Sequence, residues 1–145
     1  MSAGNIKYED DDAATGKITV DADEYKNLRE SAAVLEGLMK NENISIAVVQ
    51  GTPPLMVLVN KGLVLLSGYS EKELLSFGIE DERNLIHPDY RELFFRRYAR
   101  RIGGSSEPEA YELRVIRKDG SSRWVSAFVN LIEYWGKRSV VISLI

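Results

Sequence analysis

His87 is the only histidine in this chain, and two kinds of chemistry depend on such a residue. A histidine can act as a general base near neutral pH, or it can ligate a metal such as heme iron. The residues that follow favour a third role, since Pro88 suits the first position of a helix and Asp89 places an acid in its first turn. We therefore predict that His87 caps a helix, and we expect it neither to catalyse a reaction nor to bind heme.

The other residues with catalytic potential lack the partners that catalysis requires. The chain contains no cysteine, which excludes disulfides, thiol nucleophiles and cysteine zinc sites. The stretch from Gly103 to Ser106 is rich in glycine but has neither the lysine nor the spacing of a phosphate-binding loop. No Gly-x-Ser-x-Gly elbow occurs, and no pair of carboxylates stands out from the surface acids. We therefore expect no enzyme activity and no metal site in this chain.

Two local motifs indicate where the structural elements begin and turn. Ser70 is followed three residues later by Glu73, a capping box that predicts a helix starting at Glu71. Asp119 and Gly120 lie between two runs of β-forming residues, which predicts a hairpin turn. These motifs, with the helix start at Pro88, predict a short helix, then a longer helix, then a long hairpin.

The spacing of apolar and turn-forming residues extends this description to the whole chain. It predicts helices over residues 23–41, 60–67, 71–76 and 88–101. It predicts strands over residues 45–50, 55–59, 110–117, 121–133 and 138–145, with an irregular stretch over residues 77–85. Two strands, then helices, then three strands fit an α+β fold in which a five-stranded antiparallel sheet carries helices on one face.

In this order, the motifs resemble those of the PAS family of sensory domains. The residues that carry the resemblance are Asn60, Gly68–Leu74, Ile86–Asp89, Arg117–Gly120 and the pair Trp124-Val125. The resemblance covers residues 44–145, which we interpret as a PAS domain preceded by a leader of residues 1–43. It implies the PAS fold, together with an N-terminal flanking helix and a sensory role.

The resemblance also implies that a small molecule would bind between the concave face of the sheet and the helices. The residues expected to line such a cavity are Asn60, Phe94, Tyr98, Ala127, Val129 and Ile142, with Arg114 at its rim. The resemblance does not identify the ligand. The alternative is a cavity that the protein's own side chains fill. Light-oxygen-voltage members form a flavin adduct on a cysteine that this chain lacks. Heme-binding members carry their histidine inside the long helix, where this chain has none.

The leader differs from the rest of the chain in its charge. Residues 1–24 hold seven acids and two lysines, whereas the whole chain has a net charge of −3. Residues 1–16 are polar and without periodicity, so we predict that they are disordered. The seam of a coiled coil is expected at Tyr25, Leu28, Ala32, Leu35 and Met39. This amphipathic helix would pack either on its own sheet or against a twin helix, and the sequence leaves both open.

Two aromatic residues on the long hairpin predict a partner. Trp124 and Phe128 alternate with small aliphatic residues, so they face the opposite side of the sheet. Large aromatic residues on an outer sheet face indicate a surface that another element covers. We predict a homodimer that uses this face and the leader helix, and half-exposed aromatics are the alternative.

Charge and hydropathy restrict the setting in which the chain acts. The near-neutral domain argues against nucleic acid as a partner, and no apolar run is long enough for a membrane span. We therefore expect a cytoplasmic location. By resemblance, the parent protein is a histidine kinase or a related prokaryotic regulator, and we expect its output domain beyond Ile145.

Overall fold

The structure is a computed structural model that describes residue 19 and residues 21–145. The chain divides into two units between Gly37 and Leu38, and each is described by itself. The predicted disordered segment, residues 1–16, lies outside the described residues. The proposed boundary between leader and domain, at residues 43 and 44, stays a prediction.

One long helix, α1 (Ala22–Lys40), begins in the first unit and ends in the second. Its start is fixed by Asp21, whose Oδ1 accepts a hydrogen bond from the Glu24 backbone N–H at 2.7 Å. Leu28 and Leu35, on the predicted coiled-coil seam, are exposed. Among the helices of the described residues, none combines the length and the low polarity that crossing a bilayer requires.

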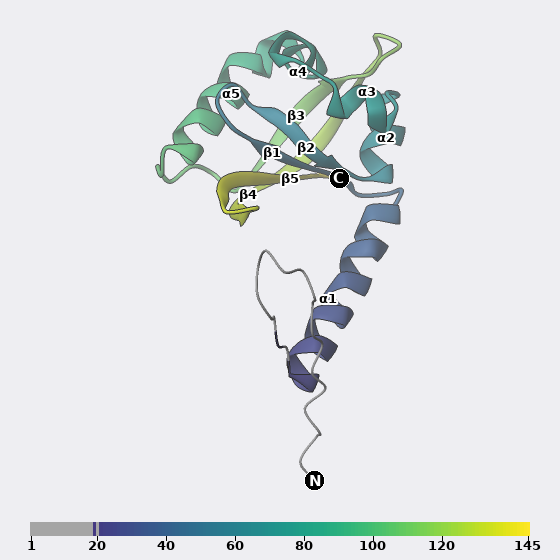
Figure 1. Cartoon of the computed structure of the whole chain (residues 1–145). Helices are drawn as coiled ribbons and strands as arrows, with labels where there is room; N and C mark the ends of the chain where they lie inside the picture. Colours follow the sequence, from purple (N-terminus) through teal and green to yellow (C-terminus); the bar gives the residue numbers. More distant parts are fainter. Residues whose placement is uncertain (1–18, 20) are drawn as a thin grey trace. The chain divides into compact units, whose positions relative to one another are not determined.

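The second unit is built on one five-stranded sheet, which confirms the predicted architecture (Figure 1). Its strands are β1 (Ser45–Gln50), β2 (Leu55–Val59), β3 (Ala110–Ile116), β4 (Ser122–Tyr134) and β5 (Lys137–Leu144). They lie in the order β2-β1-β5-β4-β3, and every neighbouring pair is antiparallel. The sequence therefore places two adjacent strands first and a three-stranded meander last, with the first and last strands of the chain paired at the centre.

Four helices lie together on one face of this sheet (Figure 1). They are α2 (Lys61–Ser67), α3 (Glu71–Leu75), α4 (Ile79–Leu85) and α5 (Pro88–Ile102). The predicted capping box is present, because Ser70 Oγ accepts from the Glu73 N–H at 3.1 Å and Glu73 Oε1 accepts from the Ser70 N–H at 3.2 Å. His87 caps α5 as predicted, since its Nδ1 accepts from the Asp89 N–H at 3.2 Å.

The helix α4 corrects the prediction that residues 77–85 are irregular. Gly78 precedes the helix, and its backbone N–H donates to Asp81 Oδ2 at 3.0 Å. The acids Glu80, Asp81 and Glu82 form the first turn, where the helix dipole favours negative charge. The acidic residues that were interpreted as a loop therefore start a helix.

The two faces of β4 differ as predicted from the alternation of its side chains. Val125, Ala127 and Val129 are buried under the helices, whereas Trp124 and Phe128 are 58% and 41% exposed on the other face.

Leu131 departs from this pattern, since it follows Val129 by two residues on the same face of β4 but is 43% exposed. The reason is that β3 pairs with β4 only as far as Phe128, so the end of β4 pairs with β5 alone.

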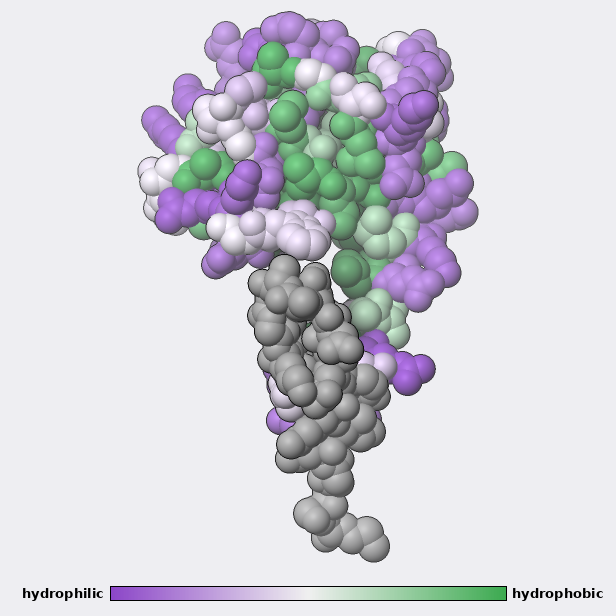
Figure 2. All heavy atoms as spheres, viewed as in Figure 1, coloured by the Kyte–Doolittle hydropathy of each residue, from purple (hydrophilic) through white to green (hydrophobic). Residues whose placement is uncertain are grey.

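The apolar interior reaches the surface at the edge of the sheet. Figure 2 shows apolar residues gathered over the part of the unit where Figure 1 places β1 and β2, with polar residues on the surrounding helices. β2 is an edge strand, and its residues Leu55 and Val57 are exposed. An edge strand also leaves backbone N–H groups without a strand partner. One of these groups, the N–H of Met56, donates to the side chain of Glu82 on α4.

Candidate ligand cavity

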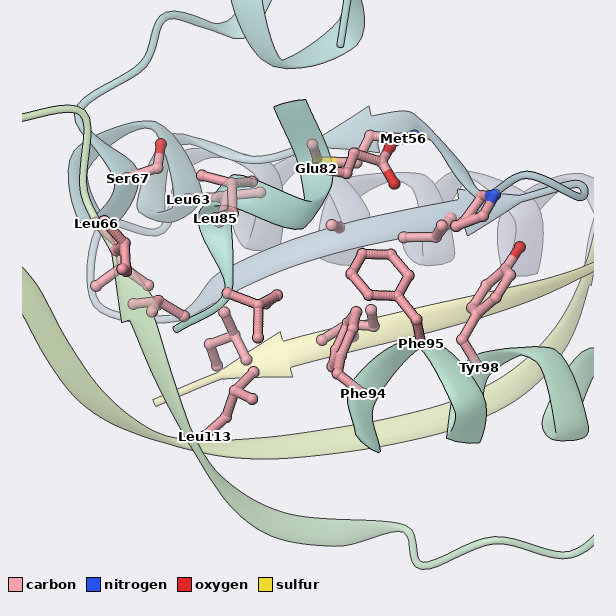
Figure 3. Close-up of a pocket in the computed structure, with 18 residues that line it drawn as sticks. Met56, Leu63, Leu66, Ser67, Glu82, Leu85, Phe94, Phe95, Tyr98 and Leu113 are labelled. Atoms are coloured by element: carbon pink, nitrogen blue, oxygen red, sulfur yellow. Dashed lines mark hydrogen bonds between the residues drawn. The ribbon is translucent and has the colours of Figure 1, made fainter. Parts of the chain in front are cut away.

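A cavity of about 80 Å³ lies between the sheet and the helices α2, α4 and α5 (Figure 3). About 10–15 Å³ on this measure holds one water molecule, so the cavity has room for several waters or a small organic molecule. Its lining is almost wholly apolar. The residues that line it include Ala47, Val49, Met56, Leu63, Leu66, Glu82, Leu85, Phe94, Phe95, Tyr98, Leu113 and Ile142.

Three aromatic rings from α5 form one wall of the cavity. Phe94, Phe95 and Tyr98 share the inner face of the helix because residues three and four positions apart point the same way. Figure 3 shows their rings rising from α5 toward the opposite wall. The Tyr98 hydroxyl is not free, since it donates to the carbonyl of Gly51 at 2.7 Å. The wall therefore offers ring faces rather than hydrogen-bonding groups.

The opposite wall contains one buried carboxyl group, that of Glu82. The residue is only 6% exposed, and it lies on α4 beside the edge strand β2 (Figure 3). Its Oε1 accepts from the backbone N–H of Met56 at 2.8 Å, which satisfies an N–H that no neighbouring strand can reach. Its second oxygen, Oε2, accepts no hydrogen bond from the described residues. A carboxylate in an apolar cavity is costly unless water, a proton or a ligand satisfies its second oxygen.

Burial shifts the proton equilibria of the two ionisable groups in the cavity. It raises the pKa of Glu82 from its ordinary 4.5 to about 7, although the hydrogen bond from Met56 acts in the opposite direction. Burial, and secondarily the negative charge of Glu82, raises the pKa of Tyr98 to about 12. Tyr98 is therefore neutral at physiological pH, whereas Glu82 is divided between its two forms.

The raised pKa of Glu82 predicts that the domain loses stability as the pH rises. The folded protein keeps the Glu82 proton up to about pH 7, but the unfolded chain releases it near its ordinary pKa of 4.5. The contribution of Glu82 to stability is therefore complete below the lower value and is lost across this window. Glu82→Gln, which stays neutral, is expected to be more stable than the wild type by an amount that grows to roughly 3 kcal/mol above the window.

Urea denaturation at a series of pH values measures this difference. Glu80→Gln is the matched control, since Glu80 is an exposed acid on the same helix. A stability difference between Glu82→Gln and the wild type that does not change with pH would show that the carboxyl is not buried in the folded protein.

The chemistry that the cavity supports is binding. Among the described residues that line it, Glu82 alone carries a carboxyl group, and no cysteine, histidine or lysine accompanies it. An enclosed apolar space with a few polar groups is the usual form of a small-molecule site.

A family model described as PAS fold matches residues 56–145, which include the strands β3 to β5, the helices α2 to α5 and most of the cavity wall. The chain belongs to the PAS-fold family. None of the curated proteins matches it in sequence.

Solved structures of PAS domains share the architecture of this one. A PAS domain from Desulfitobacterium hafniense is 16% identical and has a TM-score of 0.63, with 76% of this chain and 97% of that chain covered. A domain of a sensory box sensor histidine kinase/response regulator from Geobacter sulfurreducens is 18% identical, with a TM-score of 0.62 over 81% and 96% of the two chains. The PAS domain of an HTR-like protein from Haloarcula marismortui is 21% identical, with a TM-score of 0.59 over 83% and 95%. At these identities the likeness establishes the fold.

The PAS cavity contains some of the residues that the sequence predicted for it. Phe94, Tyr98 and Ile142 line the cavity itself. Val129 lines a second space of about 10 Å³, which also touches Phe94, Tyr98 and Ile142 and is too small for a ligand. Ala127 is fully buried and lines neither space.

The prediction that Asn60 lines the cavity is wrong, because hydrogen bonds within the protein occupy its whole side chain. It is 2% exposed and lies outside the cavity lining. Its Oδ1 accepts from the N–H groups of Ile46 at 2.8 Å and Leu63 at 3.0 Å. Its Nδ2 donates to the carbonyls of Leu38 at 2.9 Å and Ile44 at 2.8 Å. Two acceptor and two donor positions are thus filled, and none is left for a ligand.

Arg114 corrects the prediction of a charge at the cavity rim. It lies on β3 between Leu113 and Val115, both of which face the cavity, so its own side chain points to the outer face. There its Nε donates to Ser122 Oγ at 3.0 Å, and its guanidinium carbon lies 5.7 Å from the ring centre of Trp124. Arg114 therefore belongs to the outer aromatic face.

The sequence interpretation missed the polar group of the site, Glu82. The signal is visible once residues 79–85 are taken as a helix, because Ile79, Glu82 and Ile86 are spaced as residues on one helical face. A single acid on the apolar face of a short helix is the pattern that reveals it.

Proposed function

We propose that this PAS domain is the sensory module of a cytoplasmic signal-transduction protein, a histidine kinase or a related prokaryotic regulator, and that a small molecule in the cavity is its signal. The observation that carries the proposal is the apolar cavity between the sheet and the helices, with one buried carboxyl in its wall. The similar domain from a sensor histidine kinase of Geobacter sulfurreducens supports the signalling role. The domain itself binds the small molecule and transmits the signal, and catalysis belongs to other parts of the protein.

The route from the cavity to the rest of the protein begins at α2. Leu63 lines the cavity, and its backbone N–H is bonded to Asn60. The same Asn60 side chain bonds the carbonyl of Leu38, in the last turn of α1. A ligand that displaces Leu63 would therefore strain the hydrogen bonds that hold the end of α1. In a coiled coil formed by α1, this strain would shift the equilibrium between two packings of the helices.

Release of a bound molecule tests the sensory role. The purified protein would be checked for heme or flavin absorbance and then denatured, and the supernatant analysed by mass spectrometry. We expect a stoichiometric small molecule in protein from its native source. Protein that is colourless and empty, and whose melting temperature responds to no small apolar compound, would contradict a sensory cavity.

A second candidate function, a dimerisation module without a ligand, is favoured by the outer sheet face. Trp124 is exposed there, with the Tyr90 ring centre 5.5 Å from its own and the Arg114 guanidinium 5.7 Å away. Phe128 lies four residues further along the same face of β4. Aromatic and arginine side chains are enriched in the buried centres of protein interfaces. A homodimer through this face and α1 is compatible with both candidate functions.

Trp124→Ala and Phe128→Ala are each expected to weaken self-association by at least about fivefold, because truncating an aromatic residue that anchors an interface costs more than about 1 kcal/mol. Folding stability should change little, since both side chains are exposed in the single chain. Sedimentation velocity and urea denaturation measure the two quantities.

Val125→Ala is the matched control for this pair. Val125 is adjacent to Trp124 but buried, so its truncation should cost about 1–3 kcal/mol of folding stability and leave the association constant unchanged. If Trp124→Ala unfolds the domain while its association is unaffected, the outer face is not an interface.

A further inference from the structure

The unpartnered oxygen of Glu82 indicates what kind of molecule the cavity accepts. We infer that the cavity binds a small apolar molecule carrying one protonated amine, and that the Glu82 carboxylate accepts a hydrogen bond from this amine. The inference rests on the proposed function, since both place the ligand in the same cavity.

The carboxyl group of Glu82 has only part of its hydrogen-bonding capacity filled by the described residues. Glu82 is nine-tenths buried, and Met56 occupies one oxygen only. No basic side chain among the described residues pairs with it. The neighbouring Arg83 is instead directed onto the ring of Phe95, with its guanidinium carbon 5.5 Å from the ring centre. The carboxylate therefore has a free acceptor and no counter-charge, and a cationic hydrogen-bond donor would supply both.

Aromatic rings line the wall that faces Glu82. Figure 3 shows the rings of α5 across the cavity from the carboxyl group. An aromatic ring attracts an ammonium group only over its face, at about 6 Å or less. The Phe94 and Phe95 rings stand at 82° to each other, and the Phe95 ring already has the Arg83 guanidinium carbon 5.5 Å from its centre. The rings therefore supply apolar surface for the body of the ligand, and the Glu82 carboxylate favours a cation over an anion in the same space.

The rest of the cavity lining has limited polarity. The Tyr98 hydroxyl donates to Gly51, and Ser67 Oγ accepts from the Tyr69 N–H at 3.2 Å. Beyond Glu82, the ligand meets aliphatic and aromatic groups such as Val49, Leu63 and Leu113. A molecule with several polar groups would leave most of them unsatisfied. The ligand therefore combines one amine with an otherwise apolar body.

Three probes of similar shape test this inference by isothermal titration calorimetry on the whole chain. They are toluene, which is neutral, benzylamine, which is cationic, and benzoate, which is anionic. At about pH 8 the Glu82 carboxyl is mostly ionised in the free protein. We expect benzylamine to bind at least about tenfold more tightly than toluene, because a hydrogen bond to a charged group contributes about 1.5–3 kcal/mol. Benzoate should bind more weakly than toluene.

The variant Glu82→Gln should bring benzylamine to the affinity of toluene, while Glu80→Gln should leave both unchanged. Equal binding of toluene and benzylamine to the wild type would overturn the inference and leave the sensory cavity intact. Tightest binding of benzoate would overturn it too, since Glu82 would then act as a proton donor. If none of the three probes binds, both the inference and the proposed cavity are wrong. The comparison of probes on the wild type does not depend on the folding of a variant.

Discussion

Replacement of Asn60 by alanine is expected to destabilise the PAS domain by about 3 kcal/mol or more. The side chain satisfies two buried N–H groups, those of Ile46 and Leu63, and two carbonyls, those of Leu38 and Ile44. Alanine would remove all four bonds and leave a void at a site that is 2% exposed. The midpoint of urea denaturation measures the loss, and Asn84→Ala, an exposed asparagine on α4, is the control.

The variant Asn60→Asp distinguishes a side chain that joins α1, β1 and α2 from one that only caps α2. Aspartate caps helices as well as asparagine does, so a residue that only capped α2 would tolerate the change. In this structure the second oxygen of aspartate would face the carbonyls of Leu38 and Ile44, which need a donor. We therefore expect Asn60→Asp to be destabilised almost as much as Asn60→Ala. A stable Asn60→Asp variant would mean that the amide does not join α1, β1 and α2.

Gly62→Ala is the second substitution for which we expect a large loss, again of about 3 kcal/mol or more. A Cβ atom on Gly62 would meet the Ile44 carbonyl oxygen at 2.1 Å and its carbon at 2.7 Å. Both are backbone atoms that the bonds to Asn60 hold in place, so the clash cannot be relieved by a side-chain rotation. Thermal or urea denaturation of the variant measures the loss.

Gly37→Ala is the control, because it makes the same change inside a helix where no atom lies within 4 Å of the added Cβ. Alanine favours helix over glycine by about 0.5–1 kcal/mol, so Gly37→Ala should leave α1 as helical as before or more so. If Gly62→Ala is as harmless as Gly37→Ala, the close approach of residues 41–44 to α2 is not present in solution.

The sequence contained most of the fold because its signals are local. Ser70 and Glu73 start α3 by bonds within one turn, and Pro88 follows a histidine that caps α5. Asp119 forms the turn of the β3–β4 hairpin, where its Oδ1 accepts from the Ser121 N–H at 2.9 Å. Such features depend on residues at most a few positions apart, so spacing alone predicts them.

The parts that the sequence did not predict depend on distant contacts. Asn60 was assigned to the cavity, but its side chain bonds Leu38 and Ile46, which lie at least fourteen residues away in the sequence. Residue spacing does not indicate contacts over such separations. Glu82 was taken for a surface acid because its partner, the Met56 N–H, lies on an edge strand twenty-six residues earlier. Arg114 was placed on the wrong face of the sheet, although strand alternation from Leu113 would have corrected it.

A small molecule that enters the space between the sheet and α5 would change the surroundings of the methyl groups there. Methyl-labelled NMR spectra recorded while toluene is added detect this change. We expect the largest shift changes at Val49, Leu63 and Leu113, which line the cavity, and no response from Leu28 and Leu131, which lie outside it. Shifts that are absent from the cavity methyls, or equally large at Leu131, would contradict binding in this space.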